Sequence, residues 1–459
     1  MYLVKNITAE QKAQEAARIF AGDFKQGEIK KRSEKLAVSR TTLYRWKEQA
    51  GGALQTLFRG TALSEDKVEL ERAVLTLYAE GHASLEGMQK CLEQLRGEHI
   101  SIGRLSQIIN EAAQRAVAHL PHMVPQGACD VALDEIFGRT PDQAYLNIVD
   151  VHSYMVLAST GPHRLDGETW RLVLTDFEER GGEINVTISD GGSAICGAIA
   201  EFYPDRLHRR DLWHIFDSAG KGLRKLRTHL GKRAGAEALP ESIEYLLDEL
   251  RELVQVVVVR DGVLLGLSAR MEEISQVLAL WVELEDAQEP RTAELVRQIR
   301  IKFRGVYDEL IAFAVDLEEK QDAVRTFLGE EALMLMGWAW QRKHWLGPSN
   351  ELVAGLDPRW QAAAVDLFQG WHHAVRASSA VENWHSILRP HLAVHRKLTP
   401  PQLALLMVWH NYRVFSRGEH KGKSPLELAG VLTEPSDWLV ALGYAPAKPL
   451  TPKSLGRAA

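Results

Sequence analysis

The chain has 459 residues, of which 45% are hydrophobic and 25% charged, a balance typical of soluble globular proteins with roughly two to four domains. No apolar run reaches the ~18 residues of a membrane span, and the first residues contain no apolar stretch of signal-peptide length. Three widely separated cysteines, Cys91, Cys129 and Cys196, predict neither a disulfide framework nor a cysteine-based metal site. We therefore expect a cytoplasmic protein with no membrane partner.

The net charge of -6 hides an uneven distribution of charge. Residues 1–60 carry twelve Lys/Arg and six Asp/Glu, and residues 372–423 carry eight and two, so each segment has a net charge of +6. Residues 237–290 hold thirteen acids and three bases, a net charge of -10, which we interpret as a solvated helical face. The two basic segments predict localised contact with a polyanion.

The first 52 residues have the pattern of three short helices, at 8–21, 29–37 and 40–49, with a tight turn at Val38. The exposed side of the third helix offers Arg40, Thr41, Thr42, Arg45 and Lys47. This pattern is typical of a helix-turn-helix, whose second helix enters the DNA major groove. It resembles the recognition region of many bacterial helix-turn-helix proteins. A three-helix packing module is the alternative.

A second helical unit follows a predicted linker at Gly51–Gly52. Its helices are expected at residues 66–80, 85–96 and 101–120. The last helix exposes Arg104, Gln107, Asn110, Gln114 and Arg115. Because its charge is mixed, we predict either a second helix-turn-helix or a packing or dimerisation module.

After Pro125 the pattern changes to that of a sheet. Strands are expected at 129–137, 144–150, 154–159 and 184–189, with helices at 167–180 and 194–201. A helix that connects two strands implies that they pair in parallel. Asp134 on the first strand and Asp190 after the fourth can then converge at one sheet edge. For Asp190 alone, followed by two glycines, turn chemistry is the alternative.

The last part of the chain returns to helical patterns, through 215–345 and again at 361–375, 381–388 and 402–415. Val256–Val259 is interpreted as buried helix. The basic run from Lys221 to Arg233 is either a DNA contact or a solvated face. Glu382 is an isolated acid in a basic segment. The basic residues predicted to hold DNA there and in the Gly-rich loop at 417–425 are Arg376, Arg389, Arg396, Lys397, Lys421 and Lys423.

Together, the strand pattern and the order of Asp134, Asp190 and Glu382 resemble the DDE-type transposases of bacterial insertion sequences, in the ribonuclease-H-like integrase superfamily. Asp211-Leu212-Trp213-His214 is similar to the Cys/Asp-x-x-His element of Mutator-like and hAT-like transposases. The stretch from Ser378 to Pro425 resembles the C-terminal catalytic region of this class, with Asn411 in a late helix and a Gly-Lys-Ser-Pro element. Several such families place a helical insertion between the second Asp and the Glu, here separated by 382 − 190 = 192 residues.

The resemblance implies a multidomain protein in which all-α helix-turn-helix units precede an α/β ribonuclease-H-like core interrupted by a large all-α insertion. The domains expected are 1–52 (helix-turn-helix), 62–121 (second helical domain), 127–214 (core, first part), 215–360 (insertion), 361–430 (core, second part, with the Glu) and 431–459 (tail).

The implied activity is DNA strand cleavage and strand transfer with two Mg²⁺ or Mn²⁺ ions. Asp134 would bridge both ions, while Asp190 and Glu382 would each bind mainly one. His214, with Asp211, would play a supporting role, or would make an ordinary core hydrogen bond. The expected partner is double-stranded DNA, bound by a homo-oligomer associated with the bacterial nucleoid.

Two alternatives remain at this point: a transposase-derived DNA-binding regulator without catalysis, and a metal-dependent DNA nuclease. Two further carboxylates are expected to lie outside the site. Glu135 should point to the opposite face of its strand from Asp134, because successive side chains alternate. Asp150 ends the second strand and could support the site, or replace Asp134 if that residue proves remote.

Overall fold

The structure is a computed structural model. It describes residues 7–20, 27–58, 65–140, 143–231, 235–341, 354–374, 379–418, 420–434 and 436–447. The chain divides into two compact units, Met1–Ala73 with Ala447–Ala459, and Val74–Pro446. Within the described ranges, no helix combines the length and the apolar character needed to cross a membrane.

In its described residues, the first unit contains α1 (Ala9–Phe20), α2 (Glu28–Leu36), α3 (Arg40–Phe58) and the first part of α4 (Glu65–Ala79). Ala16, Ile19, Leu43 and Trp46 form its small core. The predicted tight turn is present, with Ala37 in the left-handed region at φ 53°.

The predicted end of α3 is wrong, because the helix continues through Gly51–Gly52 to Phe58. Each helical glycine costs about 1 kcal/mol relative to alanine. Ala50, Ala53 and Leu54 on either side are good helix formers and offset that cost.

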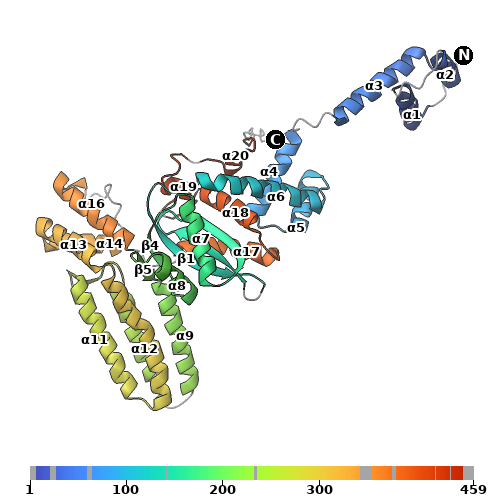
Figure 1. The fold of residues 1–459 in the computed structure, drawn as a ribbon. Coiled ribbons are helices and arrows are strands. Elements are labelled where there is room, and N and C mark those ends of the chain that lie inside the picture. The colour runs from blue at the N-terminus through green and yellow to red at the C-terminus, as the bar shows by residue number, and fades with distance from the viewer. Residues whose placement is uncertain are drawn as a thin grey trace, which may run out of the picture. The chain divides into compact units, whose positions relative to one another are not determined.

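The second unit is built on a mixed five-stranded sheet, so the chain is an α/β protein rich in helices (Figure 1). Its strands are β1 (Cys129–Phe137), β2 (Gln143–Asp150), β3 (Val156–Arg164), β4 (Ile184–Ser189) and β5 (Leu207–Arg210), in the order β3-β2-β1-β4-β5. β1, β2 and β3 pair antiparallel, and β4 pairs in parallel with β1 and β5. The four predicted strands are present, although β3 begins and ends later than expected. The strand β4 does pair in parallel, but with β1 and β5 and not with β3, the strand from which the helix α7 (Gly167–Glu179) leads to it. β5 was not predicted, because its four residues show no apolar alternation.

Helices pack on both faces of this sheet. α7 (Gly167–Glu179) and α8 (Ser193–Phe202) follow β3 and β4, and α17 (Ser379–Val394) and α18 (Pro400–Tyr412) pack against β1, β2 and β3. Asp134 contacts α17 and Glu135 contacts α7, so the two layers lie on opposite faces. Asn411 of α18 holds the edge of β3 through hydrogen bonds of 2.8 and 2.9 Å to the backbone of Val156.

The three helices predicted after the linker are confirmed as α4 (Glu65–Ala79), α5 (Leu85–Arg96) and α6 (Ile102–His119), followed by η1 (Leu120–His122). The side chains of Ser84 and Ser101 cap α5 and α6. α6 packs against α18, so it belongs to the same compact unit as the sheet. Two short helices, α19 (Pro425–Leu428) and α20 (Trp438–Ala441), also contact α18.

Between β5 and α17 the chain forms a predominantly helical body (Figure 1). Among the described residues of this body, the helices are α9 (Leu212–Leu230), α10 (Ala238–Leu253), α11 (Leu267–Asp286), α12 (Pro290–Ile311), α13 (Ala314–Leu328), α14 (Glu330–Gln341) and α16 (Pro358–His373). They share one apolar core, in which Trp281, Phe303 and Trp371 are fully buried. The core includes α16, so the helical body extends past the boundary expected at residue 360.

The prediction of buried helix at Val256–Val259 is wrong. Val259–Arg260 (β6) pairs instead with Val263–Leu264 (β7) in a small hairpin. Asp261-Gly262 makes its turn with positive φ at both residues, as a two-residue hairpin loop requires. The guanidinium of buried Arg270 donates to the carbonyls of Gln255 and Val256, which satisfies backbone that a helix would have paired.

Candidate metal centre

The sheet register brings Asp134 and Asp190 to one edge. Leu133 of β1 pairs with Ser189 of β4, so the next residue on each strand is one of these aspartates. The Asp190 carboxylate accepts a hydrogen bond from the Gly192 N–H at 2.7 Å, which is the turn chemistry expected for an Asp before two glycines. Asp190 therefore makes the turn and also lies beside Asp134.

Arg210 supplies a positive charge near Asp190. Gly191 adopts φ +83°, and a Cβ there would come within 2.6 Å of the Arg210 Nε atom. The guanidinium therefore lies against the turn, in space that a side chain at position 191 would fill. The sequence pattern did not single out Arg210, because one exposed arginine in a basic stretch carries no distinctive signal.

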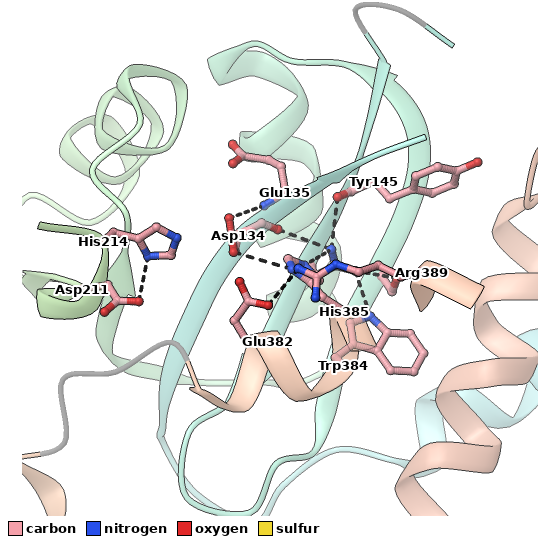
Figure 2. A network of polar contacts seen from close by, with 11 residues as sticks. Asp134, Glu135, Tyr145, Asp211, His214, Glu382, Trp384, His385 and Arg389 are labelled. Atoms are coloured by element: carbon pink, nitrogen blue, oxygen red, sulfur yellow. Dashed lines mark hydrogen bonds and ion pairs between the residues drawn. The ribbon is translucent and has the colours of Figure 1, made fainter. Parts of the chain in front are cut away.

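α17 brings Glu382 to the same edge from the late part of the chain (Figure 2). Glu382 lies in the first turn of the helix, and its Oε2 is 2.9 Å from Nη2 of Arg389. Both side chains are partly exposed. Arg389, predicted to hold DNA, thus neutralises Glu382 in this structure.

α9 brings His214. Asp211 caps the helix, and its backbone N–H donates to the Ser189 carbonyl at 2.7 Å, which ties the start of α9 to the end of β4. The fully buried Asp211 carboxylate accepts a hydrogen bond from Nδ1 of His214 at 2.9 Å. This hydrogen bond raises the pKa of His214, and the negative charges of Asp211, Asp134 and Asp190 raise it further.

These side chains form two overlapping groups with the spacing of metal ligands. In one, single ligand atoms of Asp134, His214 and Glu382 all lie within 4.8 Å of one another. In the other, the same holds for Asp134, Glu135 and Asp190. Asp134 belongs to both, and Asp190 and Glu382 approach it in separate groups. The three carboxylates predicted from the sequence are therefore gathered around Asp134.

Asp134 is the buried centre of this arrangement. Its side chain is 11% exposed, and burial raises its pKa to about 7. Among the described residues, its carboxylate accepts one hydrogen bond, from the Glu135 N–H at 2.8 Å. A buried carboxylate with so few donors is costly to ionise unless a cation compensates it.

Glu135 differs in part from the prediction. Its carboxylate does accept a hydrogen bond from Nε1 of Trp170 on α7, at 3.0 Å, as expected for a side chain on the opposite face from Asp134. Nevertheless, the expectation that it lies outside the site is wrong, because a carboxylate oxygen reaches Asp134 and Asp190. Its long side chain at the sheet edge explains this reach. Burial raises the pKa of Glu135.

The α17 face of the sheet contributes three residues that were not predicted, Asn147, Trp384 and His385. His385 Nδ1 is 3.7 Å from Oδ2 of Asp134 (Figure 2). Burial lowers the pKa of His385 to about 4, so the ring is neutral at pH 7. One signal could have revealed Asn147, since an amide in the middle of an apolar strand needs specific partners.

Asp150 does not support this centre. It pairs with Val131, three residues before Asp134 on β1, and its carboxylate accepts hydrogen bonds from the N–H and hydroxyl of Ser153. Asp150 lines a cavity of about 230 Å³ whose other lining residues include Asp130, His152 and Asn185. The role proposed for Asp150 as a replacement for Asp134 is therefore not needed.

The predicted DNA-contacting residues are mostly exposed. In the first unit, Arg40, Thr41 and Arg45 are exposed, and Thr42 and Lys47 are partly buried. In the second unit, Arg396, Lys397, Lys421 and Lys423 are exposed. Arg376 lies outside the described residues. These exposures are compatible with phosphate contacts, which require accessible cations.

No model of a known protein family matches this chain, and a comparison with curated protein sequences finds no match either.

Proposed function

We propose that this protein is a DDE-type DNA transposase that cleaves and joins DNA strands at the ends of a mobile element. One observation carries the proposal: carboxylates from β1, from the end of β4 and from α17 approach one another around the buried Asp134. The residues that supply them are separated by long stretches of chain. A gathering of like charges needs a function or a counter-ion to offset its electrostatic cost.

The donor set fits Mg²⁺ or Mn²⁺. These cations prefer oxygen ligands, and Asp134, Asp190 and Glu382 would hold them, with Glu135 within reach of the same place. When bound, the ions would polarise the scissile phosphate and activate the attacking hydroxyl or water. His214 would orient or contact the scissile phosphate through Nε2, because its Nδ1 is already hydrogen-bonded to Asp211.

The remaining features fit a DNA substrate. The strand order β3-β2-β1-β4-β5 with antiparallel β1–β2–β3 supports the ribonuclease-H-like core that the sequence resembles. The exposed Arg396, Lys397, Lys421 and Lys423 would hold phosphates near the late helices. Arg389 would exchange Glu382 for a DNA phosphate when a cation occupies the site.

The first unit would recognise the element ends through α3. Replacement of the exposed Arg45 by Gln should weaken DNA binding and reduce the slope of log affinity against log salt by about 0.9, the value for one lost phosphate contact. The matched control is Arg18→Gln, because Arg18 lies on α1 beside Glu15. Equal losses for both variants would contradict a role for α3 in DNA recognition.

The activity is tested with purified protein, Mg²⁺ or Mn²⁺, and DNA that carries candidate element ends. Strand-transfer products should form with the wild type and with Asp205→Asn, an exposed acid outside the site. They should be absent for Asp190→Ala and Glu382→Ala. Cleavage without joining would favour a nuclease, and DNA binding without any metal-dependent cleavage would favour a regulator. Either result would overturn the proposal.

A further inference from the structure

A buried amide beside the metal centre has a defined orientation. Asn147 is fully buried, lies opposite Asp134 in the β1–β2 register and faces α17. Its side chain is 2.9 Å from Nε1 of Trp384 and 2.8 Å from the Ser159 hydroxyl. Because an indole N–H can only donate, the amide atom that faces Trp384 is the oxygen.

The orientation of Asn147 determines the tautomer of His385. With its oxygen toward Trp384, the Asn147 amide presents Nδ2 to Nε2 of His385 at 3.1 Å. An amide nitrogen only donates, so Nε2 must accept and cannot carry a proton. His385 is 2% exposed, and an imidazole carries a proton on at least one of its two ring nitrogens. Its single ring proton is therefore on Nδ1, which faces Oδ2 of Asp134 at 3.7 Å.

We propose that His385 is a positioning residue for Asp134: the Trp384–Asn147 pair holds the imidazole as the Nδ1–H tautomer, and that N–H orients the carboxylate at the centre of the site. The metal-binding part of this proposal rests on the proposed function. The Glu135 N–H restrains Oδ1 and His385 restrains Oδ2, which leaves the remaining lone pairs directed to a cation. The 3.7 Å between His385 Nδ1 and Asp134 Oδ2 is longer than a hydrogen bond. Such contacts commonly shorten when the substrate and its cofactors are bound.

This assignment also excludes His385 as a metal ligand. A ring nitrogen that carries a proton has no lone pair for a metal, and the other nitrogen is occupied by Asn147. His214 is the histidine whose ligand atom falls within 4.8 Å of those of both Asp134 and Glu382. The two histidines thus have different roles. His214 faces the cation or substrate, and His385 acts through Asp134.

The tautomer is tested by ¹⁵N NMR on full-length protein labelled at histidine, without metal, at pH 7. The His385 signals are assigned by their loss in His385→Asn. We expect a protonated Nδ1 and an unprotonated Nε2, which is the less common form in free histidine. Asn147→Asp, which replaces the donor by an acceptor, should move the proton to Nε2 or add one there. A wild-type ring protonated on Nε2 alone would overturn the proposal.

Mn²⁺ titration of the same proteins tests the effect on Asp134. An Asn side chain places its amide N–H near the position of Nδ1, whereas Gln places it near Nε2. His385→Asn should therefore bind Mn²⁺ within about threefold of the wild type, and His385→Gln and His385→Leu should lose about 10- to 100-fold, as outer-shell partners do. Equal affinities in all three variants, or equal losses, would contradict positioning by Nδ1–H. Wild-type protein that binds no Mn²⁺ would refute the proposed function, and the NMR result alone would then decide the tautomer.

Discussion

The strand β1 carries two buried aspartates, Asp130 and Asp134, whose carboxylates differ in how fully they are hydrogen-bonded. At one end, both oxygens of buried Asp130 have donors, Nε2 of His152 at 2.9 Å and Nδ2 of Asn185 at 2.8 Å. At the other end, Asp134 is equally buried, but its carboxylate accepts one hydrogen bond among the described residues and lies within 4.8 Å of further acids. We infer that Asp130 stabilises the fold, whereas the buried carboxylate of Asp134 would be stabilised by a bound cation.

An acid-plus-histidine pattern in a sequence is therefore a weak indication of a metal site until the hydrogen bonds of the acid are known. Asp130 with His152 is as suggestive in sequence as Asp134 with His214. The partners separate them, because a carboxylate saturated by protein donors has little left to offer a metal.

Replacement of Asp134 should reduce catalysis most. Asp134→Asn should lower strand-transfer activity by about 1,000-fold or more, equivalent to roughly 4 kcal/mol of transition-state stabilisation. Asp130→Asn makes the same chemical change four positions earlier and should retain activity within a few-fold. Rates measured with Mn²⁺ under single-turnover conditions test the comparison. Similar losses of activity in Asp134→Asn and Asp130→Asn would show that the two aspartates do not differ in role.

The stability of the protein should depend on pH through Asp134. Burial raises the folded-state pKa of Asp134 to about 7, above the ordinary 3.8 of an aspartate. Between these values the folded protein binds more protons than the unfolded chain, so this group's contribution to stability falls as pH rises from about 4 to about 7. Its total size is on the order of 2–4 kcal/mol. Urea unfolding of wild type and Asp134→Asn at several pH values measures it.

We expect the difference in unfolding free energy, variant minus wild type, to increase with pH across that window and to level off above it. A difference that is independent of pH would show that Asp134 is not held in a strained, buried state.

Asp130, whose two carboxylate oxygens both accept hydrogen bonds, should contribute to stability and not to metal binding. Asp130→Asn should destabilise the protein by about 1–3 kcal/mol, because it weakens the pairing of His152 and Asn185 with a buried acceptor. Its effect on Mn²⁺ affinity should be negligible. Chemical unfolding and Mn²⁺ titration of this variant check both parts. A loss of Mn²⁺ binding with unchanged stability would reverse the roles assigned to the two ends.

Replacement of Arg389 should change stability and metal affinity only slightly. Both side chains of its pair with Glu382 are partly exposed to solvent, so Arg389→Gln should change the unfolding free energy by less than about 0.5 kcal/mol. Without this competing cation, Mn²⁺ affinity in the absence of DNA should rise by roughly a few-fold. Lys397→Gln, an exposed control on the loop after α17, should leave Mn²⁺ affinity unchanged. Weaker Mn²⁺ binding in Arg389→Gln would contradict competition for Glu382.

Much of the sheet could be predicted because its strands alternate or run as apolar blocks, and Gly and Pro mark their ends. The approach of Asp190 to Asp134 followed from parallel pairing alone. The contributions of Glu135, Asn147 and His385 could not be predicted in this way. They depend on how far a glutamate reaches around a sheet edge, and on which buried polar groups α17 meets. The hairpin at Val259–Leu264 was missed because four consecutive valines suit a buried helix as well as a strand.

We predict that Asp134 on β1 binds divalent cations and that Asp130 on the same strand does not. Crystals grown or soaked with Mn²⁺ test it directly, since the anomalous signal locates the ion without reference to activity. We predict Mn²⁺ within coordination distance of Asp134 and at least one of Asp190 and Glu382, and none in the cavity beside Asp130 and Asp150. Mn²⁺ bound only in that cavity, or absent from Asp134 at saturating concentration, would show that Asp134 is not a ligand of divalent cations.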